Sequence, residues 1–336
     1  MPSSIAKGEC SQDVLDHLVK DRPEPTSEIF RPNAWYGSAR ILKNFAKWPL
    51  PLPVVVPHGV YLDDFLWDAE ITNGLPAIYC FEAHRTEIYR ARSDKEIVAG
   101  CSPWMYLLRC RESNVRMKVG TVAFPPHSTQ HLESRLSDEA RYMATLQSLP
   151  SWMRPVRVCL YWRDIQLGRH EAYRSAGFEV VTAGHMFDGL FFDRLYEIMD
   201  GSEYLHTTVV GSHIFYGAAK GLKIVLDSSF EHEVVADESI LRRDCPPLDP
   251  SRRLMNLIEK ARSIYGAGDD VEHQKAFAIE ILGGNNWQSP REMRRLFFRL
   301  YLQSRALRAA VIRLALHSLG ASMRRRACAP LFPPER

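Results

Sequence analysis

Histidines recur in this sequence at turns that follow predicted strands, where they could carry proton transfer. His58, His127 and His185 each come after a short apolar run, and His213 lies in a glycine turn before a helix pattern. Histidine is the usual general base near neutral pH, and its ring N–H can donate to a phosphate oxygen. A purely structural role is open for each histidine taken singly, but their shared placement favours a site built at strand ends.

The turn that contains His213 also has the features of an anion site. Residues 204–210 form an apolar run, a small-residue helix pattern covers 214–220, and a second apolar run covers 223–227. This succession predicts a compact βαβ unit in which a glycine ends the helix. Unpaired N–H groups at the helix start can hold an anion, and Ser212 adds a hydroxyl donor. Ordinary helix capping explains the same turn, so both interpretations stay open.

Other chemistries have weaker support. His127 and His131 stand four residues apart, as two metal ligands on one helix face do, but the glutamate of an HExxH motif is missing. No GxGxxG, GxxxxGKS/T, GxSxG or DxD motif occurs. The seven cysteines are odd in number and include no CxxC pair, which is typical of reduced thiols in a cytosolic protein. The sequence therefore predicts neither a metal site nor a bound cofactor.

Apolar runs alternate with helix patterns along most of the chain. Strands are predicted at 54–56, 76–81, 97–100, 118–124, 156–162, 178–182, 204–210 and 223–227. Such alternation indicates an α/β fold with largely parallel sheets. A proline-bracketed linker at 150–155 divides the strands into two similar sets, which predicts two Rossmann-like domains facing a cleft. We expect an N-terminal domain over 1–150, a second domain over 151–245 and C-terminal helices over 246–336.

Three of these features together resemble the CDP-glycerol glycerophosphotransferase and capsule-polysaccharide transferase families. They are an early strand followed by Pro-His-Gly at 57–59, a proline-rich turn with Pro-His-Ser at 126–128, and a hydroxyl-rich turn before a late helix. The resemblance runs through short motifs between residues 54 and 227. Two motifs depart from the families. The middle motif of the families has the order His-Pro, whereas this chain has Pro-His-Ser. In the late motif this chain has Thr207-Thr208 and Gly-Ser-His, where the families have an acidic residue followed by Tyr-Ser-Ser.

The resemblance implies a GT-B enzyme, in which two Rossmann-like domains enclose the active site. His58 would be the base that activates the acceptor hydroxyl, from the acceptor-side N-terminal domain. The donor phosphates would be bound by His127 and Ser128, facing from the N-terminal domain, and by Thr208, Gly211, Ser212 and His213 in the second domain. Further cleft candidates follow other strand ends or the Pro-His-Gly turn: Asp63, Asp64, Glu82, Arg85, Asp164 and His185. A helix N-terminus and side-chain donors can stabilise a leaving phosphate without a metal.

Composition and charge place limits on partners and location. The chain has 336 residues, 46% of them hydrophobic, and a net charge of +3, so no whole-molecule basic field favours nucleic acid. No apolar run reaches the ~18 residues of a membrane span, and the first residues lack the apolar stretch of a signal peptide, so we expect a cytoplasmic protein. Residues 291–326 carry ten arginines and one acidic residue. This last predicted helix either packs with a solvated basic face or touches the anionic inner face of the cell membrane.

These inferences together predict transfer of a sugar or polyol phosphate from a nucleotide-activated donor to a bacterial surface-polysaccharide or lipid-linked acceptor. A nucleotide-sugar epimerase or hydrolase on the same scaffold is one alternative. A non-catalytic scaffold, held at the membrane by the basic helix, is the other.

Overall fold

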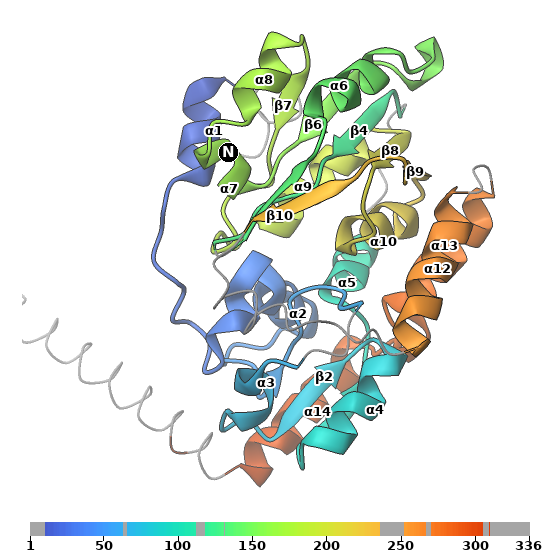
Figure 1. Ribbon diagram of the computed structural model, residues 1–336. Coiled ribbons are helices and arrows are strands. Elements are labelled where there is room, and N and C mark those ends of the chain that lie inside the picture. Colours follow the sequence, from blue (N-terminus) through green and yellow to red (C-terminus); the bar gives the residue numbers. More distant parts are fainter. Residues whose placement is uncertain are drawn as a thin grey trace, which may run out of the picture.

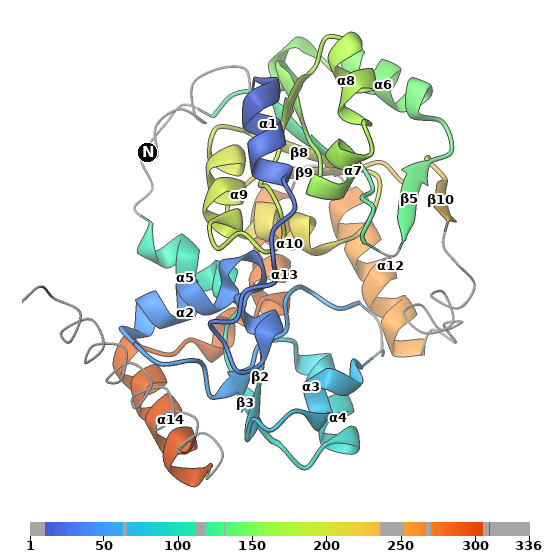
Figure 2. The same cartoon turned by 90° about the vertical axis from the view of Figure 1, so that its left-hand side faces the viewer.

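The chain folds into two parallel β-sheets, each packed with helices, and a small antiparallel pair of strands (Figure 1). The structure is a computed structural model that describes residues 11–62, 66–111, 118–130, 132–235, 252–266, 270–304 and 309. Figure 2 shows the two sheets in separate units, with the larger sheet above the smaller one. In the described part of the chain, none of the helices has the length and apolar character that a bilayer span requires.

The first sheet has three parallel strands in the order β1-β2-β3. They are β1 (Val54–Val55), β2 (Ala77–Cys80) and β3 (Glu96–Ala99). β1 and β2 are buried along their whole length, as parallel strands covered on both faces are. The helices of this unit are η1 (Arg31–Gly37), α2 (Ser38–Ala46), α3 (Asp68–Thr72), α4 (Ala83–Arg92), α5 (Pro103–Cys110) and α14 (Pro290–Gln303).

The second sheet has five parallel strands in the order β7-β6-β4-β8-β9. They are β4 (Thr121–Phe124), β6 (Val156–Cys159), β7 (Glu179–Val181), β8 (Tyr204–Thr207) and β9 (Lys223–Leu226). The chain builds outward from β4 through β6 to β7, then crosses back so that β8 pairs on the other side of β4. This reversal is a topological switch point, where open α/β sheets bind ligands.

Helices and a strand pair surround the second sheet. Its own helices are α6 (Glu139–Gln147), α7 (Trp162–Gln166), α8 (His170–Ser175), α9 (Phe191–Asp200) and α10 (Ser212–Ala219). Three more helices pack on this unit, namely α1 (Gln12–Val19) on α7, and α12 (Arg252–Gly266) and α13 (Val271–Ile281) on β9 and α10. The remaining elements are the antiparallel strands β5 (Glu133–Leu136) and β10 (His232–Val235), and the short helices η2 (Ser151–Met153) and η3 (Gly284–Asn286).

The largest hydrophobic core joins the two units. Trp104 from α5 is fully buried against Phe192, Tyr196 and Tyr216 of the second unit. Its indole Nε1 donates to the main-chain carbonyl of Tyr216 at 3.0 Å. Because this contact combines large aromatic burial with a buried hydrogen bond, it fixes the position of α10 relative to the first unit.

The α/β class, the eight predicted strands and the two Rossmann-like units are confirmed, but the boundary between the units is not where the sequence predicted it. Residues 121–124 form the central strand of the second sheet, where Thr121 faces Val156 on one side and Tyr204 on the other. The chain thus changes sheet between β3 and β4, upstream of the predicted linker at 150–155. A local apolar pattern marks a buried strand but does not name its partner.

Both ends of the described chain also depart from the prediction. The helix α1, assigned to the N-terminal domain, contributes Leu15 and Val19 to the core of the second unit. The helix α14, assigned to a separate C-terminal segment, packs on α2 in the first unit. The continuation predicted for this helix beyond residue 304 lies outside the described residues, apart from position 309.

Candidate functional site

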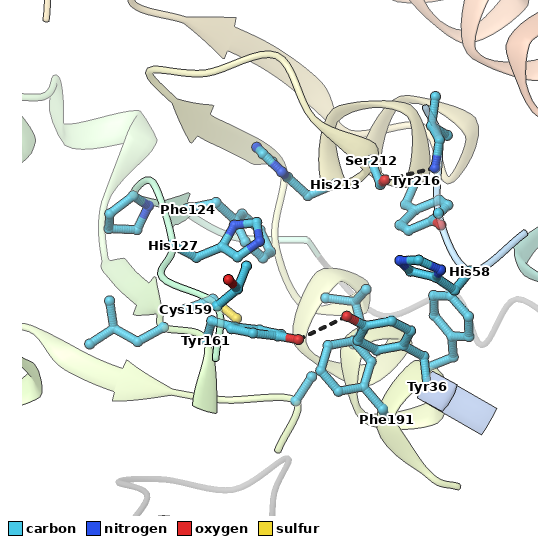
Figure 3. A pocket seen from close by; sticks show the side chains of 18 of the residues that line it. Tyr36, His58, Phe124, His127, Cys159, Tyr161, Phe191, Ser212, His213 and Tyr216 are labelled. Atoms are coloured by element: carbon cyan, nitrogen blue, oxygen red, sulfur yellow. Dashed lines mark hydrogen bonds between the residues drawn. The ribbon is translucent and has the colours of Figure 1, made fainter. Parts of the chain in front are cut away.

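A cavity of about 300 Å³ lies between the two units (Figure 3). Its walls are made by the residues that follow strands β1, β4, β6 and β7, together with the starts of α9 and α10. We call it the interunit cavity. Its polar lining includes three histidines, two hydroxyl residues and four tyrosines: His58, His127, His213, Ser212, Thr129, Tyr36, Tyr61, Tyr161 and Tyr216.

The topology explains why these residues meet. The carboxyl ends of parallel strands lie at one edge of a sheet, and the reversal between β4 and β8 opens a crevice at that edge. The turn after β4 carries His127, and the turn after β8 leads to Ser212 and His213. His58 lies in the turn that follows β1 and enters the cavity from the first sheet. The cleft predicted between the units is therefore present.

His58 is held in an aromatic setting that keeps it neutral. Its Nδ1 lies 2.9 Å from the hydroxyl of Tyr61. Four rings surround the imidazole at centroid distances of 5.0 to 6.1 Å, those of Trp35, Tyr36, Tyr61 and Trp67. Desolvation, with a smaller contribution from the charge of Arg85, lowers the pKa of His58 to about 4. His58 is therefore unprotonated at neutral pH and can accept a proton.

His213 is anchored at the edge of the second sheet. The hydroxyl of Thr207 donates to the carbonyl of Phe124 at 2.9 Å, so its oxygen accepts from the Nε2–H of His213, also at 2.9 Å. The ring stacks on that of Phe124 with centroids 5.2 Å apart. Burial lowers the pKa of His213 to about 3, and the charge of the neighbouring His127 makes a smaller contribution in the same direction. His213 is thus a neutral residue that lines the cavity, and its Nε2 is already hydrogen-bonded to Thr207 in β8.

His127 reaches the cavity from the turn after β4. Its ring lies 4.9 Å from that of Tyr161. Surrounding protein lowers the pKa of His127, although its side chain is exposed at the edge of the cavity and keeps part of its hydration. A neutral imidazole at this place can donate one hydrogen bond to a ligand but brings no positive charge.

The start of α10 forms another wall of the cavity and touches the Pro-His-Gly turn directly. The Oγ of Ser212 accepts from the N–H of Val60 at 2.9 Å, and the serine hydroxyl is also hydrogen-bonded to the side chain of Tyr216 at the cavity wall. A Cβ at Gly59 would lie 3.1 Å from this Oγ, so glycine permits the close approach. Gly211, in extended backbone, precedes the helix without a side-chain cap and does not line the cavity. In the first turn of α10 the N–H of Ile214 donates to the carbonyl of Gly211 at 3.1 Å, and the two residues before it, Ser212 and His213, lie at this wall.

Three residues of the predicted phosphate set do not line the cavity: Gly211, Ser128 and Thr208. Ser128 is fully buried, and its Oγ accepts from the N–H of Ser134 at 3.2 Å. Thr208 is buried as well and lies outside the lining. Ser128 differs from the prediction because neighbouring residues in a turn project to opposite sides, and its neighbours His127 and Thr129 line the cavity instead.

Asp164 supports the turn after β4 and does not line the cavity. Its carboxylate accepts from the N–H of Ser128 at 3.2 Å and pairs with Arg169 at 2.9 Å. Burial raises the pKa of Asp164 to about 6 despite these partners. Asp164 was predicted to contact the nucleotide-activated substrate. Its carboxylate is instead enclosed by hydrogen-bond donors of the protein and has a structural role.

Glu82 and Arg85 lie behind the Pro-His-Gly turn. The Oε1 of Glu82 accepts from the N–H of Tyr61 at 2.7 Å, and its Oε2 lies 3.7 Å from the Nε of Arg85. Both side chains are buried and neither lines the cavity. The structure therefore does not bring them to the cavity predicted for the ligand, and they hold the segment that carries His58.

The remaining predicted residues are one buried histidine and two acids. The ring of His185 packs at a tilt against that of Trp162 with centroids 4.0 Å apart, and its Nδ1 accepts from the N–H of Phe187. It is buried in the second unit, away from the cavity. Asp63 and Asp64 lie outside the described residues.

Sequence reasoning missed the tyrosines of the cavity. The hydroxyls of Tyr36 and Tyr161 lie 2.8 Å apart and join the two units across one side of the cavity (Figure 3). Tyr36 has a left-handed backbone, with φ of 57°. Tyr161 follows β6, inside a run predicted as strand. Neither position has a local signal, because a tyrosine in an apolar run is indistinguishable from a core residue.

Within the described ranges, no group of three or more histidine, cysteine or acidic side chains is arranged to hold a metal. The spacing of His127 and His131 is not tested, since residue 131 lies outside those ranges. The lining of the cavity contains no carboxylate, lysine or arginine among the described residues. Recognition of a ligand there depends on neutral hydrogen-bonding groups and on the N-terminus of α10.

Comparisons with known proteins give only distant likenesses. No protein family model and no curated protein matches the chain. Among solved structures, a sucrose-phosphate synthase from Thermosynechococcus elongatus is similar over 71% of this chain and 59% of its own, with 11% identity and a TM-score of 0.25. WaaG, a glycosyltransferase involved in lipopolysaccharide biosynthesis, is similar over 62% of this chain and 63% of its own, with 14% identity and a TM-score of 0.21. The chain thus spans less than two thirds of either protein, and the functional argument rests on the cavity.

Proposed function

We propose that this protein is a glycosyltransferase of the two-domain GT-B type that uses a nucleotide-activated donor. One observation carries the proposal: a neutral histidine from one unit and the N-terminus of a helix from the other line the same cavity, at the carboxyl ends of both sheets. Group transfer from an activated phosphate needs a base for the acceptor and hydrogen-bond donors for the leaving phosphate. His58 supplies the first and α10 the second.

In the proposed reaction, His58 accepts the proton of an acceptor hydroxyl as that oxygen attacks the anomeric carbon of the donor. The bond from this carbon to the phosphate oxygen breaks, and the electron pair leaves with the phosphate. The developing charge meets the first-turn N–H groups of α10, the hydroxyl of Ser212 and the ring N–H of His127. These donors are fixed by the fold before the reaction, which is the condition for electrostatic stabilisation. No metal enters this scheme.

The finer assignment follows the motifs. The Pro-His-Gly turn that resembles the glycan-transferase families is the segment that brings His58 to the cavity. This placement supports transfer of a sugar or polyol phosphate to a bacterial surface glycan or lipid-linked acceptor, in the cytoplasm. The volume of about 300 Å³ is at the lower end for ligand pockets and matches a sugar with its adjoining phosphate more closely than a whole nucleotide sugar.

A thermal-shift screen with CMP, CDP, UDP, GDP and their sugar conjugates tests the proposal. We expect one nucleotide series to raise the unfolding free energy by about 2.7 kcal/mol at 100 times its Kd. His58→Ala should retain this nucleotide affinity and lose transfer, whereas Ser212→Ala should bind the nucleotide more weakly. Ser289→Ala is the matched control, because Ser289 caps α14 and does not line the cavity.

The outcomes separate the candidate functions. Stabilisation by none of these nucleotides would contradict a nucleotide-dependent enzyme and favour a non-catalytic scaffold. Consumption of a nucleotide sugar at full rate without any acceptor would instead indicate an epimerase or hydrolase. Transfer at the wild-type rate by His58→Ala would remove the histidine from the role of base.

We further propose that α14 contacts an anionic membrane surface near the acceptor. Two large apolar side chains, Phe298 and Leu302, are 58% and 53% exposed one turn apart on this helix. Arginines 291 and 295 lie on the same helix, whose single acidic residue is Glu292. An exposed apolar pair beside cations is the pattern of an interfacial helix. The full-length protein should sediment with vesicles that contain anionic lipid and not with neutral ones, and Phe298→Ser with Leu302→Ser should weaken this binding.

A further inference from the structure

A chain of hydrogen bonds leads from His58 to a buried carboxylate that lies outside the cavity. The Nδ1 of His58 is 2.9 Å from the hydroxyl of Tyr61, and the same hydroxyl is 3.3 Å from the Oε1 of Glu70. The other carboxylate oxygen of Glu70 accepts from the hydroxyl of Tyr89 at 2.7 Å. Glu70 is 2% exposed and does not line the cavity.

The number of protons shared by His58, Tyr61 and Glu70 decides in which direction each of their hydrogen bonds is donated. Tyr61 has one hydroxyl proton, and an ionised Glu70 can only accept. When Tyr61 donates to Glu70, its oxygen must accept from His58, which places the imidazole proton on Nδ1. The unprotonated nitrogen of His58 is then Nε2, and the ring is ready to accept a proton from a ligand in the cavity.

The guanidinium of Arg85 lies beside Glu70 and over the ring of Tyr61, which keeps both side chains in place. The guanidinium of Arg85 lies 3.8 Å from Glu70, 3.7 Å from Glu82 and 4.3 Å from the ring centroid of Tyr61. The main-chain N–H of Tyr61 donates to Glu82 at 2.7 Å. The guanidinium thus lies between the two carboxyl groups, and the burial of all three side chains makes the arrangement rigid.

We propose that Tyr61 and Glu70 are positioning residues that hold His58 as its Nδ1–H tautomer, an inference that deepens the proposed glycosyl transfer. As Nε2 takes the acceptor's proton, the Nδ1–H of the imidazolium stays hydrogen-bonded to Tyr61, whose proton stays on the bond to Glu70. The acceptor's O–H bond breaks, the N–H bond at Nε2 forms, and Glu70 remains ionised throughout. The arrangement orients the base and gives its imidazolium a hydrogen-bond acceptor without a second proton transfer.

The tautomer can be measured without knowledge of the substrate. In ¹⁵N-labelled protein at pH 7, we expect His58 to show a protonated Nδ1 and an unprotonated Nε2, with the resonance assigned by its loss in His58→Ala. Tyr61→Phe should shift the ring toward the Nε2–H form. Tyr89→Phe is the matched control, because it removes a hydroxyl from Glu70 but leaves the bonds between His58, Tyr61 and Glu70 intact. It should keep the wild-type tautomer.

A second variant keeps the proposal testable where Tyr61→Phe does not fold. In Glu70→Gln the new amide group can donate to the hydroxyl of Tyr61, which turns the tyrosine proton toward His58 and again favours Nε2–H. An Nε2–H tautomer in the wild-type protein, or an unchanged tautomer in the folded variants, would overturn the proposal.

Kinetics distinguish this inference from the proposed function. Once the donor is known, Tyr61→Phe should lower kcat about tenfold or more with little change in nucleotide affinity. This loss in kcat is smaller than the roughly 10²–10⁴-fold loss expected when the base itself is removed. An unchanged kcat would contradict a positioning role. The expected tautomer in a protein that transfers no sugar would refute the glycosyltransferase and leave the hydrogen-bond chain established.

Discussion

The lowered pKa of His58 makes a quantitative prediction about stability in acid. Desolvation in its aromatic surroundings, with the charge of Arg85 adding to it, brings the pKa from 6.5 to about 4 in the folded protein. In the unfolded chain the same histidine binds a proton near pH 6.5. Between these values the unfolded state binds more protons than the folded state, so stability falls as the pH falls from 6.5 to about 4, and this contribution levels off below.

The size of the effect follows from the pKa difference. One pKa unit corresponds to about 1.4 kcal/mol, so a fully desolvated His58 would cost about 3 kcal/mol of unfolding free energy by pH 4. The ring is only partly buried and water screens it, which makes this an upper value. For a base, the same shift means that about 97% of His58 is neutral at pH 5.5, against about 9% for a histidine of ordinary pKa.

The assay is urea unfolding of the wild-type protein and His58→Asn at pH 7, 5.5 and 4.5, with an NMR titration of the His58 ring. We expect a titration midpoint near 4 and a weaker loss of stability toward acid in the variant. Burial also lowers the pKa values of His206 and His213, to about 4 and about 3, but their contribution is common to both proteins and cancels. A midpoint near 6.5, with equal pH dependence in the two proteins, would refute the reasoning.

Three further predictions concern the structure around the site. Gly37→Ala should destabilise the protein by about 2 kcal/mol or more, because φ is +81° and the new Cβ would lie 2.2 Å from a main-chain carbonyl oxygen, whereas Gly74→Ala meets no atom within 4 Å and should be near neutral in urea unfolding. A double-mutant cycle of Tyr36→Phe and Tyr161→Phe should give a coupling of about 1 kcal/mol for their hydrogen bond, and additive single effects would show that it does not join the units. Ser289→Ala should cost about 1 kcal/mol in thermal unfolding through loss of the capping box of α14, and an unchanged melting temperature would argue against that cap.

The sequence by itself determined the local elements and the chemistry at their ends. Apolar runs of strand length became β1, β4 and β8. The turns after β1 and β4 carry His58 and His127, and the turn after β8 leads to His213 at the start of α10. Because parallel strands present their carboxyl ends at one edge, histidines spread over about 150 residues of chain could be expected in one cleft. The structure does bring all three to the interunit cavity.

The tertiary structure decided which elements pair and which side of each turn faces the ligand. The apolar pattern of β4 is the same whichever sheet it joins, and only pairing with β6 and β8 places it in the second sheet. His127 lines the cavity while its neighbour Ser128 bonds to Ser134, a difference set by the path of the turn. The contacts of Tyr61 with Glu70 and of Tyr36 with Tyr161 are equally invisible in local patterns. These contacts join residues through side-chain packing in three dimensions. The periodicity of apolar residues and secondary-structure propensities describe only neighbours along the chain.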